Sequence, residues 1–396
     1  MENLSPAEWE DLLRLVFEPR SEDRVLGIWV DVPDERVADR EAWADRRRLA
    51  LEWSSTLPGP ARNLGLESVE LVAYPNVGSN NGDLPSSVFL LRGEVDESVL
   101  ASADALRAAG EEVPLDSMMA AHDLILLPTE FSATAPMKLA AKKHGYRAAT
   151  MPGFARDMVP ALRIDFGEVA RRLGIVKERL DAADEARVRF EVRDPEGGTS
   201  EESIVFDLRH RAATVSAGLL REPGIAGNLP SGETYIVPFE GLDPSEGSEG
   251  DPSRTEGTLP VEFDGEIVRY RIRGNDAFQI DGDGTIAERE RDFLSREPAY
   301  GNIAELGFGV LRDLGVQPVG SILLDEKLGF HVAFGRSDHF GGAVGTSDFK
   351  DPANVVHIDR IYIPETQPRV RVKEIRLVTD HGSDEVFFEN GRYSDF

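Results

Sequence analysis

The first 150 residues alternate between short apolar runs and amphipathic segments. Apolar runs predict strands over residues 25–32, 68–74, 87–91 and 124–127, and amphipathic segments predict helices over residues 41–53, 97–109 and 135–144. An earlier helix is predicted from Ser5, because Ser5-Pro6-Ala7-Glu8 forms a capping box ahead of an apolar residue at Trp9. Alternation of strands and helices is typical of a parallel α/β sheet.

The pattern changes between residues 165 and 186. A helical stretch from Asp165 to about Ala183 gives way to short β-rich segments at residues 187–192, 203–208, 234–237, 260–263 and 267–272. We therefore predict two domains, an N-terminal parallel-sheet α/β domain over residues 1–170 and a β-rich α+β domain over residues 171–396. Residues 242–257 are rich in Gly, Ser, Pro and acidic side chains and predict an exposed loop.

Composition narrows the classes of function. The 72 acidic and 44 basic residues give a net charge of −28, which argues against nucleic acid or an anionic membrane as a partner. No apolar run is long enough to span a membrane, and the N-terminus does not have the pattern of a signal peptide, so we expect a cytoplasmic protein. The sequence contains no Cys, so any metal must bind to His, Asp or Glu.

Histidines and carboxylates gather in the C-terminal half. Three of the seven histidines, His331, His339 and His357, fall within 27 residues of one another. His357 and Asp359 lie two apart on a predicted strand, so both point to one face and could bind one ion. Such a triplet also occurs by chance as a surface histidine beside a charge.

Three further segments carry candidate ligands amid small and apolar residues. They are Glu305 within Gly301–Gly309, His331 within Leu324–Gly335, and Glu233 at the end of Asn228–Glu233. A lone carboxylate in apolar surroundings is costly unless it is protonated, paired or bound to metal. Taken singly, a cap or turn for Glu233, a salt bridge for Glu305 and a core position for His331 are equally open.

Together these segments resemble the thermophilic aminopeptidase family of dinuclear metallopeptidases, the aminopeptidase T type. Asn228–Pro238 is similar to its N-L-P-x-G-E-x-x-x-x-P segment, and Asn302–Gly309 to its N-I-A-E-L-G-x-G segment. Asp325–Gly335 resembles a shorter form of its D-E-K segment, which ends in H-x-A-x-G. An F-G-G at Phe340 and an H-x-D at His357 follow in family order. Five ordered motifs are more specific than any one of them, and the N-terminal half fits the family more loosely.

The resemblance implies a set of five metal ligands, with Glu305 as the bridging carboxylate: Glu233, Glu305, His331, His357 and Asp359. It implies two divalent ions (Zn, Co, Mn or Mg), removal of N-terminal residues from a peptide or peptide-like substrate, and a homodimer. A Tyr found in some members seven residues after the ligand His is Asp338 here, which bears on the substrate. Glu326 and His339 are the candidates for a catalytic role beside the metal-bound water.

Two other functions stay open. The resemblance extends to ring-opening dihydroxypyridine dioxygenases, which hold one Fe(II) on two histidines and an aspartate, a set that His331, His357 and Asp359 could imitate. Those enzymes carry His at the position of Glu305, so the Glu favours the hydrolase. A non-catalytic binding protein that retains the fold is the third possibility.

Overall fold

The chain is described from a computed structural model, which covers residues 3–194, 197–241, 251–351, 354–379 and 381–396. It forms two compact units, each with its own core. The first unit comprises Met1–Gly167 and Ser216–Ser231, and the second comprises Glu168–Val215 and Gly232–Phe396. Most of the predicted acidic loop, residues 242–250, lies outside the described residues.

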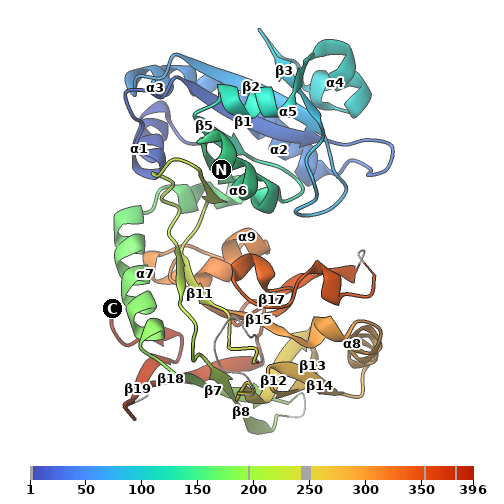
Figure 1. Cartoon of the computed structure of the whole chain (residues 1–396), viewed down its shortest axis with the longest axis vertical. Helices are drawn as coiled ribbons and strands as arrows, with labels where there is room; N and C mark the ends of the chain where they lie inside the picture. The colour runs from blue at the N-terminus through green and yellow to red at the C-terminus, as the bar shows by residue number, and fades with distance from the viewer. Residues whose placement is uncertain (1–2, 195–196, 242–250, 352–353, 380) are drawn as a thin grey trace. The chain divides into compact units, whose positions relative to one another are not determined.

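The first unit is built on a seven-stranded sheet, drawn in blue to green in Figure 1 apart from its yellow-green edge strand near residue 225. Its strand order is β10-β6-β5-β1-β2-β3-β4. The strands are β1 (Val25–Val32), β2 (Ser68–Pro75), β3 (Ser87–Leu91), β4 (Glu111–Pro114), β5 (Leu124–Leu127), β6 (Arg147–Thr150) and β10 (Ile225–Asn228). β10, β6, β5, β1 and β2 pair in parallel, whereas β3 and β4 pair antiparallel. The predicted α/β class is therefore confirmed as a mixed, mostly parallel sheet, because β2 and β3 are joined without a crossover helix.

Helices accompany this sheet largely where the pattern predicts them. They are α1 (Pro6–Phe17), α2 (Glu41–Thr56), α3 (Pro58–Asn63), α4 (Ala103–Ala109), α5 (Leu115–Ala121) and α6 (Thr134–His144), with 3₁₀ turns η1 (Glu97–Leu100) and η2 (Arg156–Leu162). The Ser5–Glu8 capping box opens α1. The single helix predicted over residues 97–109 is divided into η1 and α4, because the Ser102 side chain caps a new helix by accepting a hydrogen bond from the Ala105 N–H at 3.2 Å.

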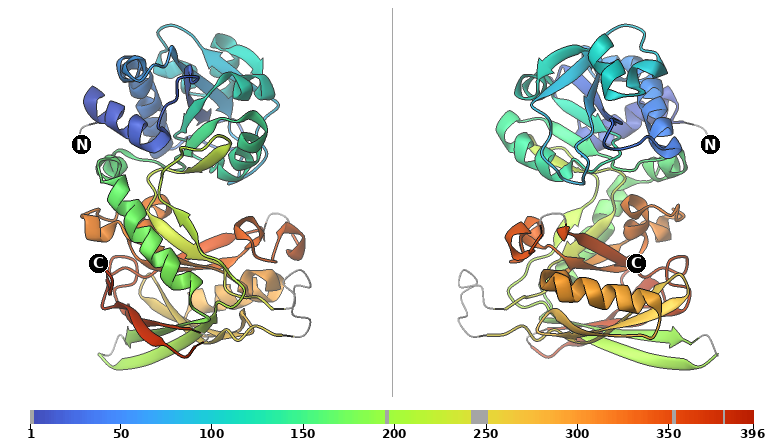
Figure 2. Two further views of the ribbon diagram at one scale, coloured as in Figure 1. Left: turned by 60° about the vertical axis from the view of Figure 1, so that its left-hand side comes forward. Right: turned by 90° about the vertical axis from the view of Figure 1, so that its right-hand side faces the viewer.

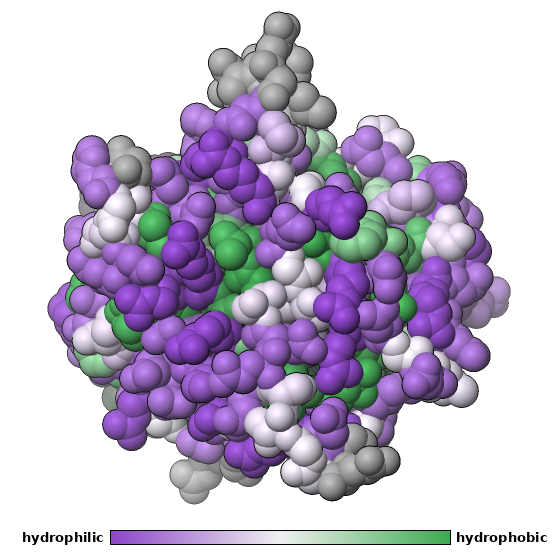
Figure 3. All heavy atoms as spheres, turned by 90° about the horizontal axis from the view of Figure 1, so that it is seen from below, coloured by the Kyte–Doolittle hydropathy of each residue, from purple (hydrophilic) through white to green (hydrophobic). Residues whose placement is uncertain are grey.

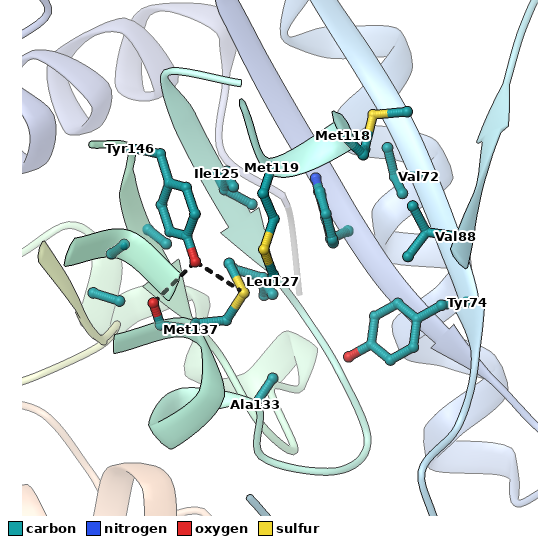
Figure 4. Packing of buried hydrophobic residues seen from close by; sticks show 14 of the residues in the cluster. Val72, Tyr74, Val88, Met118, Met119, Ile125, Leu127, Ala133, Met137 and Tyr146 are labelled. Carbon is teal, nitrogen blue, oxygen red and sulfur yellow. Dashed lines mark hydrogen bonds between the residues drawn. The ribbon is translucent and has the colours of Figure 1, made fainter. Parts of the chain in front are cut away.

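The core of the first unit is apolar and closely packed. Figure 4 shows side chains from β2, β3 and β5 meeting those of α5 and α6, with Ile125, Leu127 and Met137 fully buried. The Tyr146 hydroxyl donates a hydrogen bond to the carbonyl oxygen of Met137 at 2.9 Å, so its polar end is satisfied inside the core. Apolar burial holds this sheet together on the face that Figure 4 shows.

The second unit contains two sheets. The five-stranded sheet has the order β17-β16-β15-β11-β9, and the eight-stranded sheet has the order β14-β13-β12-β8-β7-β18-β19-β20. The five strands are β9 (Thr214–Ser216), β11 (Glu233–Ile236), β15 (Ile303–Gly309), β16 (Phe330–Gly335) and β17 (His357–Ile361). The eight strands are β7 (Glu185–Arg193), β8 (Thr199–Asp207), β12 (Glu256–Phe263), β13 (Glu266–Arg273), β14 (Asp276–Asp281), β18 (Val370–Val378), β19 (Asp384–Glu389) and β20 (Arg392–Tyr393). These antiparallel sheets confirm the predicted β-rich second half.

Few helices complete this unit. They are α7 (Phe166–Asp181), α8 (Thr285–Arg296) and α9 (Ile322–Asp325), with 3₁₀ turns η4 (Pro298–Gly301), η5 (Arg312–Leu314), η6 (Glu326–Leu328), η7 (Asp338–Phe340) and η8 (Thr346–Asp348). Both views of Figure 2 show α8 lying along the strands of the β12–β14 region, which it contacts through β13 and β14. Among the described helices, none has the length and apolar character to cross a membrane.

One face of the five-stranded sheet packs on the eight-stranded sheet. Phe334 lies 4.8 Å from Tyr270 between ring centres, and Phe308 lies 5.4 Å from Phe387. Because successive side chains of a strand alternate, the side chains of Glu305 and His331 project from the opposite face, on which Gly307 also lies.

Hydrophilic residues dominate the face of the molecule that Figure 3 shows, in keeping with the net charge of −28.

Candidate metal centre

Four neighbouring strands bring the five predicted ligands to one face of the five-stranded sheet, here called the ligand face. The five residues are Glu233 at the start of β11, Glu305 in β15, His331 in β16, and His357 and Asp359 in β17. The register places Ala333 opposite both Glu305 and Asp359, so the two carboxylates flank the strand that carries His331. Alternate side chains of a strand share one face, and four adjacent strands contribute to this one. The cluster therefore joins residues as far as 126 positions apart in the sequence.

The cluster consists of two groups of three that share one carboxylate. Glu233, Glu305 and His331 each offer a ligand atom within 4.8 Å of the others, and so do Glu305, His357 and Asp359. His331 Nε2 lies 3.5 Å from Glu233 Oε2 and 3.5 Å from Glu305 Oε1. His357 Nε2 lies 3.1 Å from the other oxygen, Glu305 Oε2, and 3.7 Å from Asp359 Oδ1. Glu305 thus directs one oxygen to each group.

The residues present fit a cation. Glu233 Oε2 and both ring nitrogens of His331 are buried and make no well-aligned hydrogen bond within the described part of the chain. Leaving such atoms unsatisfied is costly in a protein interior, and a divalent ion between the carboxylate and the imidazole would satisfy Glu233 Oε2 and His331 Nε2. Carboxylate oxygen and imidazole nitrogen are donors that Zn, Co and Mn share.

Gly307 makes room for the central histidine. A Cβ added at Gly307 would lie 1.8 Å from His331 Nε2, so the imidazole occupies the space over the glycine. Gly309 likewise admits the backbone of Lys327, whose carbonyl carbon would lie 2.1 Å from a Cβ there. The alternating glycines of the Asn302–Gly309 segment are the sequence signal of this close approach.

A buried lysine lies beside the cluster, and it is not among the predicted site residues. The Lys327 side chain is 1% exposed, and its ammonium group donates hydrogen bonds to Glu233 Oε1 at 2.5 Å and to Glu326. Burial disfavours the charged amine, but the two carboxylates hold the pKa of Lys327 above its usual value. Burial raises the pKa of Glu326 to about 8 against the opposing charge of Lys327. The signal in the sequence that could have identified it is a charged triplet, Asp325-Glu326-Lys327, set between apolar residues.

The electrostatics of the cluster favour charged imidazoles when no ion is bound. Burial lowers the pKa of His331, but the neighbouring carboxylates Glu305 and Glu233 outweigh it and raise that pKa to about 10. The pKa of His357 is raised to about 9 in the same way, by Glu305 and Asp359. Burial also opposes the ionised form of Glu305, yet the two histidines keep its pKa below its usual range. A metal ion would take the place of these protons.

The two candidates for a catalytic role lie beside different ligands of the cluster. Glu326 is buried against Lys327, as described above. The His339 ring lies 5.2 Å from the His357 ring at 80°, and burial lowers the pKa of His339 to about 4, so it is neutral at physiological pH. Asp338, at the position of the family's Tyr, receives a hydrogen bond from Arg336 Nε at 2.5 Å. These contacts place Glu326 and His339 beside the ligands without assigning either a catalytic role.

Comparison with known proteins supports the fold. No family model matches the sequence, and no curated protein matches it significantly. Among solved structures, a 2,5-dihydroxypyridine dioxygenase from Pseudomonas putida KT2440 is similar, with a TM-score of 0.59 and 16% sequence identity. The similarity covers 99% of this chain and 97% of that chain. The fold is therefore of the dihydroxypyridine dioxygenase and aminopeptidase T type, with a buried His/Glu cluster that could bind metal.

Proposed function

We propose that the chain is a metal-dependent aminopeptidase that uses two divalent ions to hydrolyse N-terminal residues of a peptide or peptide-like substrate. One observation carries this proposal: two groups of three ligand atoms share Glu305, and each of its oxygens faces a different histidine. A carboxylate with one oxygen in each of two groups is suited to bridge two ions. Glu233 and His331 would complete one position, and His357 and Asp359 the other.

When bound, two ions would polarise the scissile carbonyl and lower the pKa of a water molecule that attacks it. The protein's own residues hold and orient this site. Lys327 fixes Glu233 through a hydrogen bond of 2.5 Å, and the Arg336 carbonyl oxygen lies 2.8 Å from His357 Nδ1, which turns Nε2 toward Glu305. Glu326 is our candidate for the group that exchanges a proton with this water, because Lys327 hydrogen-bonds both Glu326 and Glu233 and because burial raises the pKa of Glu326 to about 8, near physiological pH.

A second candidate function is a mononuclear Fe(II) ring-cleaving dioxygenase. The structural comparison favours it, because the similar structure is a dihydroxypyridine dioxygenase. The triad it requires would be His331, His357 and Asp359. However, the described groups place His331 and His357 in different clusters, each completed by carboxylates. We therefore rank the hydrolase first on the ligand geometry.

Metal content separates the two candidates. The protein would be purified without chelator, and its metal per chain would be measured by elemental mass spectrometry alongside Glu305→Gln. The hydrolase requires about two divalent ions, which fall sharply in the variant, and release of N-terminal residues in a peptide screen. One iron per chain, with oxygen consumed when a dihydroxylated aromatic compound is added, would favour the dioxygenase over the hydrolase. No metal after reconstitution would leave a binding protein that retains the fold.

We also propose that the chain forms a homodimer. Sedimentation of the purified protein would test it independently of the metal content.

A further inference from the structure

The Arg336–Gly345 loop, which follows β16, is hydrogen-bonded to the carboxylate of Glu240. Glu240 Oε1 accepts hydrogen bonds from the Ser337 hydroxyl at 2.5 Å and from Asn302 Nδ2 at 3.0 Å. Glu240 Oε2 accepts one from the Ala343 N–H at 2.6 Å. The Glu240 side chain is 6% exposed, so these bonds are shielded from water. A single side chain therefore joins the beginning of β15, the end of β16 and the returning half of the loop.

Further bonds make this arrangement rigid. Arg211 Nη2 lies 3.2 Å from Glu240 Oε2, which supplies the charge that a buried carboxylate requires. The Ser337 hydroxyl also accepts a hydrogen bond from the Val344 N–H at 3.1 Å. A Cβ added at Gly342 would lie 2.2 Å from Ser337 Oγ, so the loop passes closely over the carboxylate.

The same loop determines the orientation of His357. Arg336, directly before Ser337, has its carbonyl oxygen 2.8 Å from His357 Nδ1. A carbonyl can only accept, so Nδ1 carries the proton and Nε2 is directed to Glu305 at 3.1 Å. At the tip of the loop, the Phe340 ring lies 5.2 Å from the His357 ring. His357 is thus held both at its outer nitrogen and on its ring.

His331 receives no comparable support from this loop. Its nitrogens make no well-aligned hydrogen bond with described residues, and its position depends instead on the space over Gly307. The two histidines of the ligand face are therefore positioned by independent means. Disturbing Glu240 should disturb one of them and spare the other.

We propose that Glu240 is a positioning residue for His357, acting through Ser337 and the Arg336 carbonyl. It thereby sets the affinity of the ion held by Glu305, His357 and Asp359, while the ion held by Glu233, Glu305 and His331 is indifferent to it. This inference rests on the proposed function, because it requires two metal positions.

Glu240→Gln tests the proposal. The amide keeps the shape of the side chain, but its nitrogen cannot accept the hydrogen bond from Ala343 or Arg211. Chelator-stripped protein would be titrated with Co(II), followed by calorimetry and visible absorption. We expect one of the two binding steps to weaken by about 10–100-fold, the usual effect of losing a group that orients a metal ligand, while the other step matches the wild type.

Glu262→Gln is the matched control. Glu262 is also buried, and its carboxylate accepts hydrogen bonds from the Arg369 N–H at 2.7 Å and Nε at 2.9 Å, but it belongs to β12 of the eight-stranded sheet. We expect it to lose stability and keep both binding steps. If Glu240→Gln fails to fold, Gly342→Ala disturbs the same contact through Ser337 without removing a charge.

The outcomes distinguish the inference from the function on which it rests. The wild type is expected to bind Co(II) in two steps. If both steps are unchanged, or equally weakened, in Glu240→Gln and in Gly342→Ala, the positioning role alone is overturned. A single step in the wild type would overturn the two-ion function, and the selective role of Glu240 with it. One weakened step of two supports both.

Discussion

Each unit contains a buried histidine that lies over a strand glycine, yet the pKa values of the two histidines are shifted in opposite directions. In the first unit, a Cβ at Gly27 of β1 would lie 2.6 Å from His122 Cδ2, and in the second a Cβ at Gly307 would lie 1.8 Å from His331 Nε2. His122 is edge-on to Trp29 with ring centres 5.7 Å apart, and burial lowers its pKa. His331 lies among carboxylates that raise its pKa to about 10. The same close approach over a glycine serves packing in one unit and the placement of a proposed metal ligand in the other.

Burial alone therefore does not identify a functional histidine. His122 Nδ1 lies 2.8 Å from the Met118 carbonyl oxygen, and its Nε2 lies 3.5 Å from a single carboxylate, that of Glu70. Burial outweighs both contacts and lowers the pKa of this ring. His331 has neither nitrogen satisfied by a well-aligned hydrogen bond within the described residues, and two carboxylates within 3.5 Å. Buried charge with unsatisfied donors and acceptors marks the second site as one that fits a ligand.

The largest expected contrast comes from removing a buried cation in each unit. Lys327→Met leaves Glu233 and Glu326 without their lysine, and Arg147→Met leaves Asp23 without its arginine. Breaking a buried pair on one side costs about 3–5 kcal/mol, so both variants should lose stability in EDTA. Added divalent metal should restore Lys327→Met alone, because an ion can compensate the stranded Glu233.

Unfolding of the two units can be followed separately in this experiment. All four tryptophans, Trp9, Trp29, Trp43 and Trp53, lie in the first unit, so tryptophan fluorescence reports on that unit. Hydrogen exchange of peptides from β15 and β16 reports on the second. Equal restoration of both variants by metal would contradict an ion site beside Lys327.

A smaller effect is expected from filling the two glycine sites. Gly27→Ala and Gly307→Ala each force an imidazole to move, and overpacking of this kind costs about 1–3 kcal/mol. Only Gly307→Ala displaces a proposed ligand, so it alone should lower the metal content per chain. Elemental analysis would measure the metal content per chain of both variants, and unfolding in urea would measure their stability. Loss of metal from Gly27→Ala would contradict the expected difference between the two sites.

Measured over a single pH unit, the smallest effect is a difference in how steeply the free energy of unfolding changes with pH in EDTA. His331 has a folded pKa of about 10 against an ordinary 6.5, so its contribution is complete below pH 6.5 and is lost as pH rises toward 10. The decline should approach about 1.4 kcal/mol per pH unit between these limits. His122 has a lowered pKa, so its contribution is present above pH 6.5 and is lost as pH falls.

Variants separate these two slopes. His331→Gln should reduce the alkaline decline in the second unit and leave the part that the raised pKa of His357 contributes. His122→Gln should remove the acid decline in the first unit. Hydrogen exchange and tryptophan fluorescence across pH 5.5–9 would report each unit in turn. An alkaline decline as steep in His331→Gln as in the wild type would assign it to other groups, with His357 the first to examine.

Local patterns in the sequence determined the elements and the ligand types. The capping box at Ser5 begins a helix, apolar runs become β1, β2, β3 and β5, and the H-x-D triplet at His357 lies on a strand with both side chains on one face. These predictions depend on periods of two or 3.6 residues, which a single segment contains in full. Absence of Cys likewise limits the metal donors to the side chains of His, Asp and Glu, and composition alone is enough to establish that.

Tertiary structure decided which segments meet. Ile225–Asn228, in the β-rich half of the sequence, joins β6 as an edge strand of the first sheet, and no local pattern indicates that return. The pairing of Gly307 with His331, of Lys327 with Glu233, and of the Arg336 carbonyl with His357 depends on strand order and register across the five-stranded sheet. Such contacts join residues that are distant in sequence, so they follow from how sheets assemble rather than from the period of any one strand.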